Sequence, residues 1–286
     1  MAVTGRRRTR AILMNGAVAG LTAVTLLPLV WMVLVSFMPR YASSRFPPPF
    51  WPERWSLENY HELLVRRLYE GVWFDYRVLP ALWNSLFVAA VATLLALILT
   101  VPAGYAFAKL EFRGRARLLK LLIAALVIPG QVAMLPLFLM LEAAGLVNTY
   151  AGVILPSLAG IFAVLFVRQT TLAIPDEMID AARLDGASEV QIFRTIVLPL
   201  LAPVTVTLAV FTFLASWNDF LWPLIVLTDQ NKYTLPVAVA AIVREHAADG
   251  ELMMASSVVT TLPVLAIFLL LQRYYMTGLL GGSVKG

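Results

Sequence analysis

The stretch Asp180-Ala181-Ala182-Arg183-Leu184-Asp185-Gly186, with Ile196-Val197-Leu198-Pro199 after it, is a polar segment between long apolar runs. Pro175-Asp176-Glu177 ahead of it indicates a helix start, because proline suits the first helical position and acids favour the positive end of the helix dipole. Gly186 can take a positive φ and end that helix. Ser188 and Gln191 have the spacing of a capping box, which starts another. The segment therefore predicts a helix-turn-helix.

The charges of this segment bear on what it contacts. It holds the acids Asp176, Glu177, Asp180, Asp185 and Glu189 against Arg183 and Arg194. An amphipathic helix resting among lipid headgroups is one interpretation, but such a helix favours a basic polar face. Acidic groups beside an anionic leaflet are disfavoured, which favours docking of a protein partner instead. Ala181 and Ala182 are small, so a partner can approach the backbone closely.

The composition is that of a membrane protein. The chain has 286 residues, is 60% hydrophobic and 14% charged, and has a mean hydropathy of +0.81. Average soluble domains carry about 25% charged residues. Apolar runs long enough to cross a hydrocarbon core of roughly 30 Å recur along the chain, and such spans should be helices that satisfy their own backbone hydrogen bonds. The sequence therefore predicts an all-α bundle of membrane-spanning helices.

Residue counts exclude other classes of site. The chain has no cysteine and two histidines, His61 and His246, so disulfides, thiolate metal sites and a histidine-rich metal centre are not expected. The net charge of +5 comes from basic residues beside apolar spans. Membrane topology explains such a pattern, and we expect neither a nucleic-acid partner nor a bound metal.

Six spans are predicted within a single membrane domain, residues 1–286. They cover about residues 12–37, 82–108, 118–141, 150–167, 200–227 and 254–274. Outside them lie an arm at 1–11, a long loop at 38–80, the polar segment at 175–199 and a tail at 276–286. Arg6-Arg7-Arg8-Thr9-Arg10 resembles the start of a signal peptide, but the apolar run after it is too long and lacks a clear cleavage site. We expect an uncleaved first span.

Lysine and arginine indicate the orientation. They are concentrated in the arm, the short 109–120 loop, the 168–195 segment and the tail. Basic residues in short loops mark the cytoplasmic side. We therefore expect both termini and the 175–199 segment in the cytoplasm, and the 38–80 loop outside.

The 38–80 loop has its own pattern. Residues 46–52 are rich in proline and cannot form a regular helix. Residues 57–64 predict a short amphipathic helix. Trp51, Trp55 and Trp73 suit a membrane surface. The loop is either an interfacial cap on the bundle or a landing surface for an external partner.

One acid, Asp219, falls inside a predicted span. At about 1.5 Å per residue, its distance along the helix from Pro199 brings it near the outer interface. Trp217 and Trp222 beside it fit an aromatic belt. Alternatively, Trp217, Asn218 and Asp219 line a solute pathway, because an ionisable residue within the membrane is a functional candidate.

Prolines interrupt the third span at Ile128-Pro129-Gly130-Gln131 and at Pro136. Proline frees a carbonyl and tends to kink a helix. The kink is either a packing feature or a hinge that turns Gln131 toward the same pathway.

The chain resembles a known family at several of these places. Asp180-Ala181-Ala182, three residues, Gly186, nine residues, then Ile196-x-Leu198-Pro199 is similar to the Glu-Ala-Ala loop of bacterial ABC import permeases. The aspartate replaces the usual glutamate, so a salt bridge there needs a closer approach. Residues 217–224 and the end of the chain, residues 272–286, resemble the carbohydrate branch, and most of all its maltose-type second permease subunit. The resemblance covers nearly the whole chain, although residues 66–77 form a longer stretch than usual.

The resemblance implies a set of partners and contacts. The permease pairs with a second, homologous permease in the bacterial inner membrane, two cytoplasmic ATPases dock on the pair, and an external binding protein delivers a sugar or oligosaccharide. The ATPase contacts fall on Asp180, Ala181, Ala182, Asp185, Gly186, Ala187, Ile196, Leu198 and Pro199. The tail, Gly282, Ser283, Val284, Lys285 and Gly286, also reaches the ATPase pair. ATP and Mg²⁺ bind to the ATPases and no cofactor to this chain.

The chain itself is not expected to be an enzyme. No nucleotide-binding Gly-x-x-x-x-Gly-Lys-Ser/Thr sequence is present, so ATP must be hydrolysed elsewhere. Three alternatives stay open. One is a related importer of glycerol phosphate or a polyamine. Another is a membrane-embedded enzyme, which needs two or more reactive groups at one depth. The third is a scaffold that anchors the ATPase without passing solute.

Overall fold

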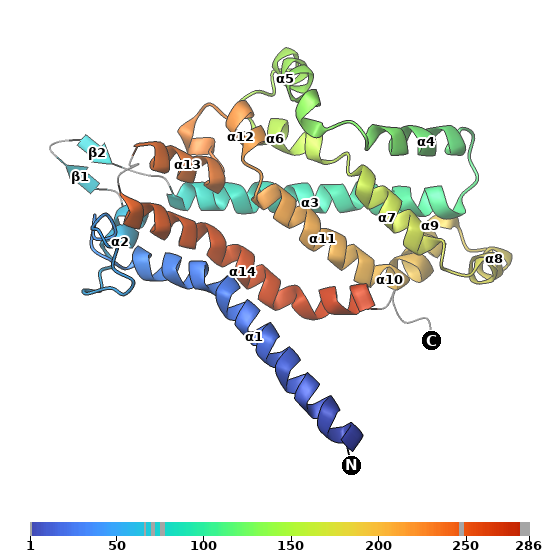
Figure 1. Cartoon of the computed structure of the whole chain (residues 1–286). Coiled ribbons are helices and arrows are strands. Elements are labelled where there is room, and N and C mark those ends of the chain that lie inside the picture. Colours follow the sequence, from blue (N-terminus) through green and yellow to red (C-terminus); the bar gives the residue numbers. More distant parts are fainter. Residues whose placement is uncertain (1, 66, 70–71, 75–77, 246–248, 281–286) are drawn as a thin grey trace. The chain divides into compact units, whose positions relative to one another are not determined.

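Long apolar helices dominate the computed structural model, which describes residues 2–65, 67–69, 72–74, 78–245 and 249–280 (Figure 1). Within these residues, three single helices are long and apolar enough to cross a membrane: Ile12–Ser36, Val78–Lys109 and Gly250–Leu270. Three bent helix pairs also qualify: Arg115–Ala125 with Gly130–Ala143, Tyr150–Ser157 with Ile161–Thr171, and Glu189–Leu200 with Ala202–Trp217. With each pair counted as one span, the described residues contain up to six segments that could cross a membrane, which is the number predicted, although the third and fifth differ from the predicted bounds.

The chain divides into two compact units. The first consists of residues 1–78 and 239–262, and the second of residues 79–238 and 263–286. The first contains α1 (Ala2–Ser36), α2 (Glu58–Leu64), strands β1 (Arg67–Tyr69) and β2 (Val72–Phe74), most of α13 (Leu235–Glu245) and the start of α14 (Gly250–Leu280). The strands pair antiparallel with Leu68 opposite Trp73. This hairpin and α13 were not predicted, whereas α2 confirms the short helix expected at 57–64.

A buried polar network organises the first unit. Glu251 is fully buried, and its carboxylate accepts hydrogen bonds from the backbone N–H groups of Tyr41, at 3.0 Å, and Ser43. Arg40 lies 3.1 Å from the buried carboxylate of Asp249. Buried acids require such partners, because a bare carboxylate out of water is costly. The network therefore ties the chain after α1 to the start of α14.

The second unit contains the remaining helices. Their bounds are α3 (Val78–Lys109), α4 (Arg115–Ala125), η1 (Gly130–Ala133), α5 (Met134–Ala143), α6 (Tyr150–Ser157), α7 (Ile161–Thr171), α8 (Asp176–Leu184), α9 (Glu189–Ile192), the π-helix η2 (Phe193–Val197), α10 (Leu198–Leu200), α11 (Ala202–Trp217), α12 (Leu221–Val226) and η3 (Gln230–Lys232). Helices α3 and α7 approach closely at Gly104, where a Cβ atom would lie 2.5 Å from Val167. Small residues at such points let helix backbones pack tightly.

The predicted third span is broken rather than kinked. Helix α4 ends at Ala125, and the chain turns by 97° before continuing through η1 and α5. Pro129 has an extended backbone with ψ near 130°, and its ring and missing N–H prevent a continuous helix. Pro136 lies in the first turn of α5, where proline is tolerated. The expectation of one kinked helix over 118–141 was therefore wrong.

The predicted fifth span was also too long. Helix α11 ends at Trp217, and α12 begins separately at Leu221. Between them the Asn218 side chain donates to the carbonyl of Leu214, and Asp219 accepts from the N–H of Trp222 at 3.4 Å. These local bonds compete with helix continuation. Near the two ends of the chain, α1 begins at Ala2 and α14 reaches Leu280. The predicted arm (residues 1–11) is therefore helical from Ala2, and the predicted tail (276–286) is helical up to Leu280.

Candidate functional site

The 175–199 segment folds as the predicted helix-turn-helix. Helix α8 starts after Pro175 with Asp176 in its first turn, and it ends at Leu184, two residues before Gly186, whose φ is +83°. The N–H of Gly186 donates to the carbonyl of Arg183, and the N–H of Ala187 to that of Ala182, both at 3.0 Å. This pair of bonds is a Schellman motif, which needs the left-handed backbone that glycine adopts without strain. The predicted role of Gly186 as a helix terminator is confirmed.

Helix α9 starts with the predicted capping box. The Ser188 hydroxyl accepts from the N–H of Gln191 at 3.4 Å, and the Gln191 side chain accepts from the N–H of Ser188 at 2.8 Å. The helix continues as the π-helix η2 and then as α10, which contains Pro199. Short π-helical turns are rare and occur often at functional sites. The segment therefore has a fixed local geometry with an unusual junction to α11.

An ion-pair network crosses the turn between α8 and α9. The Arg183 guanidinium donates to Asp180 at 2.9 Å and to Glu189 at 2.7 Å. The second oxygen of Glu189 accepts from the Tyr105 hydroxyl of α3 at 2.8 Å. The hydrogen bond from Arg183 lowers the pKa of Glu189 and outweighs its partial burial, and the bond from Tyr105 adds to the lowering. Glu189 is thus held as a carboxylate that links both short helices to α3.

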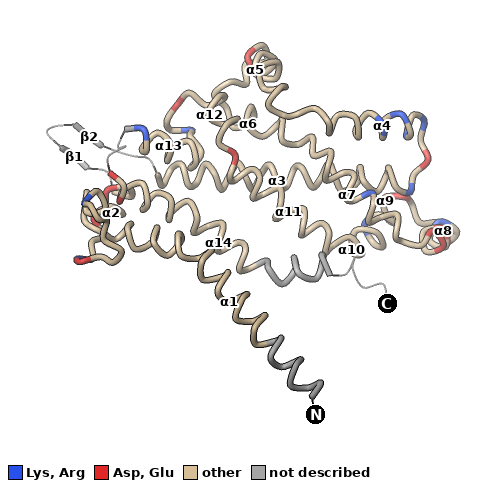
Figure 2. The backbone as a smooth tube through the Cα atoms, viewed as in Figure 1, with Lys and Arg blue, Asp and Glu red and all other residues tan. Residues whose placement is uncertain are grey.

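A second link joins α8 to the end of α3. The Lys109 ammonium donates at 2.6 Å to the carbonyl of Ile174 and at 2.6 Å to Asp176. Its side chain is only 6% exposed, so the charge lies where Asp176 and the carbonyl replace water. The hydrogen bond from Lys109 lowers the pKa of Asp176. Figure 2 shows the resulting gathering of acidic and basic residues around α8. The sequence suggested no partner for Lys109 or Tyr105, since both lie far away along the chain.

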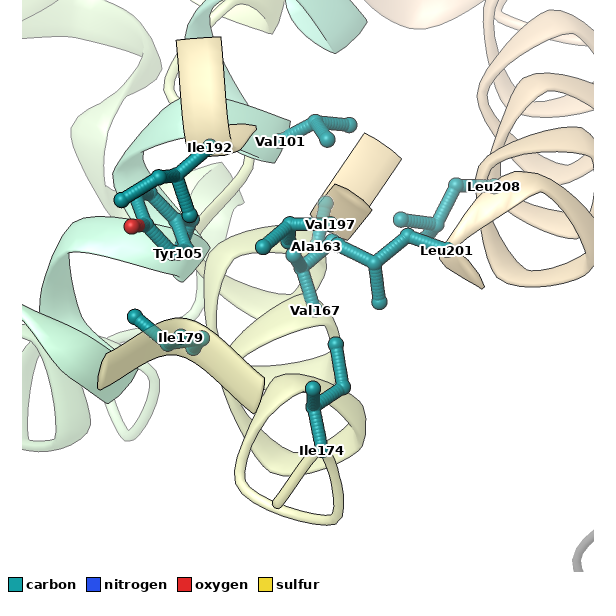
Figure 3. Close-up of a cluster of buried hydrophobic side chains, with 10 residues drawn as sticks. All are labelled: Val101, Tyr105, Ala163, Val167, Ile174, Ile179, Ile192, Val197, Leu201 and Leu208. Atoms are coloured by element: carbon teal, nitrogen blue, oxygen red, sulfur yellow. The ribbon is translucent and has the colours of Figure 1, made fainter. Parts of the chain in front are cut away.

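The inner side of the segment is anchored in an apolar cluster. Its buried members are Val101, Tyr105, Ala163, Val167, Ile174, Ile179, Ile192, Val197, Leu201 and Leu208 (Figure 3). Ile179 of α8 is 1% exposed and Ile192 of α9 is fully buried. The other members come from α3, α7, α11 and the turns beside them. A displacement of α8 would therefore strain the contacts with these longer helices, because a packed interior transmits strain.

The outer side of the segment is apolar as well as charged. Successive residues of an α-helix are turned by about 100°, so Ala181 and Leu184 point away from the buried Ile179. The Leu184 side chain is 89% exposed and that of Val190 is 60% exposed. Ala181 and Leu184, three residues apart on α8, therefore present an apolar outer face to solvent.

The residues predicted for docking differ in exposure. Asp180, Ala181, Asp185, Gly186, Leu198 and Pro199 are exposed, whereas Ala182, Ala187 and Ile196 are half-buried and pack against the apolar cluster. The predicted set therefore has an outer and an inner part. The predicted tail contacts, Gly282 to Gly286, lie outside the described residues.

The end of α3 is closed by two arginines. The Arg115 guanidinium donates to the carbonyls of Phe107, Ala108 and Leu110 at 3.0–3.2 Å. Arg168 donates to the carbonyl of Phe107 at 3.2 Å. The last carbonyls of a helix lack partners within the helix, and a cation there also offsets the negative end of its dipole. These bonds fix the turn that carries Lys109.

The four residues predicted for a solute pathway are not brought together. Gln131 lies exposed in η1. Trp217 is 1% exposed and stacks on Phe213 with ring centroids 5.9 Å apart. Asn218 is exposed, and Asp219 lines a cavity in the second unit. Trp222 is also buried, and its indole N–H donates to the carbonyl of Gly152 at 3.1 Å. The two tryptophans thus pack inside the chain rather than facing outward as an aromatic belt would.

Comparison with known proteins gives consistent matches over nearly the whole chain. The model of the family described as "Binding-protein-dependent transport system inner membrane component" matches residues 2–279. An arabinooligosaccharides transport system permease of Halalkalibacterium halodurans is 35% identical over 286 residues, which cover 98% of this chain and 100% of the relative. A trehalose/maltose transport system permease of Thermococcus litoralis is 33% identical over 287 residues and 97% of both chains. A lactose transport system permease of Rhizobium radiobacter is 36% identical over 203 residues, 71% of this chain and 74% of the relative.

A solved structure shares the fold. It belongs to a bacterial ABC transporter involved in the import of the acidic polysaccharide alginate. Its TM-score is 0.78, with 22% identity over 94% of this chain and 97% of that chain. This likeness supports the arrangement of helices.

Proposed function

Since the chain belongs to the family of binding-protein-dependent transport system inner membrane components, we propose that it is the permease subunit of an ATP-driven importer for a sugar or oligosaccharide. The observation that carries the solute class is the full-length similarity to permeases named for arabinooligosaccharides and for trehalose and maltose. The test is uptake of radiolabelled arabinooligosaccharides, lactose, trehalose and maltose by cells with and without the importer. Uptake of glycerol phosphate or spermidine in place of every sugar would overturn the solute class.

The outer face of the 175–199 segment is the proposed docking surface for an ATPase subunit. Three features support this: the exposed Ala181 and Leu184, the ion pairs that fix the turn, and the apolar cluster that joins the inner face to α3, α7 and α11. Closure of an ATPase dimer would then pull α8 and move the longer helices. Such coupling requires that nucleotide favour one arrangement of the helices over the other.

The remaining partners follow from the same proposal. A second, homologous permease completes the membrane unit, two ATPase subunits supply ATP and Mg²⁺ chemistry, and an external binding protein delivers the solute. The residues from Gly282 to Gly286 are a further proposed ATPase contact. Both termini and the 175–199 segment face the cytoplasm, which the distribution of basic residues supports.

The absence of native cysteine makes docking and orientation testable together. We would introduce Ala181→Cys on the outer face of α8 and, as the matched control, Glu53→Cys in the loop after α1, where the side chain is 79% exposed. In intact cells a membrane-impermeant maleimide should label Cys at 53 and not at 181. In the assembled importer, Cys at 181 should crosslink to the ATPase and Cys at 53 should not.

Two results would overturn this proposal. Labelling of position 181 from outside would reverse the orientation. Failure of any cysteine along the outer face of α8 to capture the ATPase, in an importer that still transports, would place the docking surface elsewhere.

A further inference from the structure

A cavity of about 330 Å³ lies within the second unit, between α3, α6, α7 and α11. Small-molecule sites in proteins have volumes of roughly 300–1,000 Å³, so this cavity has room for a small ring. Its lining is mixed. Hydroxyl groups come from Ser157, Thr212 and Ser216, a carboxylate from Asp219, and aromatic faces from Phe162 and Phe211.

The helices leave this space for two local reasons. The α6–α7 pair bends by 40° at residues 158–160, so its backbone does not follow a single straight line past α11. On α11, Leu208, Thr212 and Ser216 recur at intervals of four and form one face. Asp219 follows three residues later, where the helix has ended. Thr212 and Ser216 are smaller than Leu208 on the same face and leave room where bulkier side chains would fill the cavity. A break in a membrane helix beside a cavity is typical of solute sites in transporters.

The polar groups of the cavity have unused hydrogen-bonding capacity. One carboxylate oxygen of Asp219 accepts a long bond from the N–H of Trp222 at 3.4 Å. Among the described residues, no other hydrogen bond to that carboxylate is formed, and none is formed by the hydroxyls of Thr212 and Ser216. All three residues are half-buried, and polar groups withdrawn in part from water cost free energy unless they find partners. An ionisable group at this place therefore points to a ligand with hydrogen-bond donors.

We propose that this cavity binds one ring of the imported saccharide, with Asp219 accepting a hydrogen bond from a sugar hydroxyl. Ser216 and Thr212 exchange hydrogen bonds with further hydroxyls, and the faces of Phe162 and Phe211 cover the ring's C–H groups. This inference rests on the proposed function and adds that this subunit itself contacts the solute. It selects Asp219 from the four residues predicted for a pathway and leaves out its neighbour Asn218.

A lipid tail and a polyamine are the competing occupants. A lipid tail forms no hydrogen bonds with the carboxylate or the hydroxyls. A polyamine would pair one of its ammonium groups with Asp219. Its remaining positive charges would find only neutral hydroxyl groups in the lining. The composition of the lining therefore favours a neutral molecule rich in hydroxyl groups.

The first test is protection of an introduced thiol. Ser216→Cys would be made in the complete importer, reconstituted in nanodiscs in the resting and vanadate-trapped states. Arabinotriose, lactose, trehalose, maltose and spermidine are the probes, and the measured quantity is the rate of labelling by N-ethylmaleimide. A saccharide at about ten times its dissociation constant should slow labelling roughly tenfold, because protection follows 1 + [L]/Kd. Gln131→Cys, exposed in η1 and outside the lining, should be labelled at an unchanged rate.

The second test removes only the charge of Asp219. In Asp219→Asn the amide oxygen can still accept from the N–H of Trp222, so the start of α12 should be preserved. A hydrogen bond to a charged group is stronger than a neutral one. We expect half-protection of Cys at 216 to need about tenfold more saccharide, with ATPase activity stimulated by the binding protein as in the parent. Gln131→Ser, in the exposed η1 turn and outside the lining, should leave both values unchanged.

The outcomes separate this inference from the proposed function. Import of no saccharide by the unmodified importer would refute the proposed function. Normal saccharide import without protection at position 216, and without an effect of Asp219→Asn, would refute only the cavity site. Protection by spermidine alone would refute the saccharide class. A thiol at 216 that reacts in the isolated chain but never in the importer would show that the second permease fills the cavity, which also overturns the proposal.

Discussion

Substitution of Gly104 by alanine should loosen the contact between α3 and α7. A Cβ atom at this position would lie 2.5 Å from both Cβ and Cγ1 of Val167 and 3.0 Å from the backbone nitrogen of Arg168. Carbon atoms in contact prefer about 3.5–4.0 Å, so the helices must separate by about 1 Å. Overpacking of this kind costs typically about 1–3 kcal/mol. We expect the upper half of that range, because Val167 is stiff and fully buried and the third atom is backbone.

Two second-site changes test the reasoning. Val167→Ala removes Cγ1 but keeps the Cβ atom at 2.5 Å, so it should not rescue Gly104→Ala. Val167→Gly removes both obstructing carbons and should rescue it in part, with a favourable coupling of about 1–2 kcal/mol in a double-mutant cycle. Gly16→Ala is the matched control in α1, because nothing lies within 4 Å of its Cβ.

The assay is thermal unfolding of the purified chain in mild detergent. One kcal/mol shifts the midpoint by about 2–4 °C for chains of roughly 150–250 residues, so a cost of about 2–3 kcal/mol should lower the midpoint of Gly104→Ala by about 4–12 °C. Gly16→Ala should raise it slightly, since alanine favours a helix over glycine by roughly 0.5–1 kcal/mol. A midpoint of Gly104→Ala within about 1 °C of the wild type, or equal rescue by Val167→Ala and Val167→Gly, would contradict the tight crossing.

Three further predictions concern the caps and the buried polar groups. Glu189→Gln should lower the unfolding midpoint at pH 7. The hydrogen bond from Arg183 lowers the pKa of Glu189, so its stabilising effect is present above the unfolded-state pKa of about 4.3 and is lost as the pH falls through the lower folded-state pKa. The midpoints of mutant and wild type should therefore converge toward pH 3, and a difference that stays constant would contradict this prediction. Asn59→Ala should cost about 1–3 kcal/mol in chemical unfolding, because this buried amide donates at 3.0 and 2.8 Å to two backbone carbonyls that would be left unpaired; full stability would show that water replaces it. Gly186→Ala should cost about 1–2 kcal/mol through its φ of +83° and reduce crosslinking to the ATPase, whereas Gly130→Ala, equally free of neighbours and without a positive φ, should do neither.

Much of the fold follows from short-range patterns. Six hydrophobic runs predict six spans, because the bilayer requires apolar side chains and internally bonded backbone over a set length. The start and end of α8 and the start of α9 were predicted from Pro175, Gly186, Ser188 and Gln191. Each of these caps acts through bonds between residues at most five apart. Such signals are complete within the local sequence.

The breaks within spans were less predictable. Pro129 marked an interruption, but not a turn of 97°. The end of α11 at Trp217 depends on the side-chain bonds of Asn218 and Asp219, which compete with apolar surroundings that favour continuing the helix. The outcome of that competition depends on what packs around the break.

Tertiary structure alone decided which distant groups meet. The Tyr105 hydroxyl reaches Glu189 across 84 residues of sequence, and Lys109 reaches Asp176 across 67. Asn218 and Asp219 are neighbours in the chain, yet only Asp219 lines the cavity. By itself the sequence determined the class of protein, the spans and the local shape of the docking segment, because hydropathy and capping act over a few residues. The direction of each side chain toward a cavity or a partner depends on how separate helices pack, and that packing is a property of the whole fold.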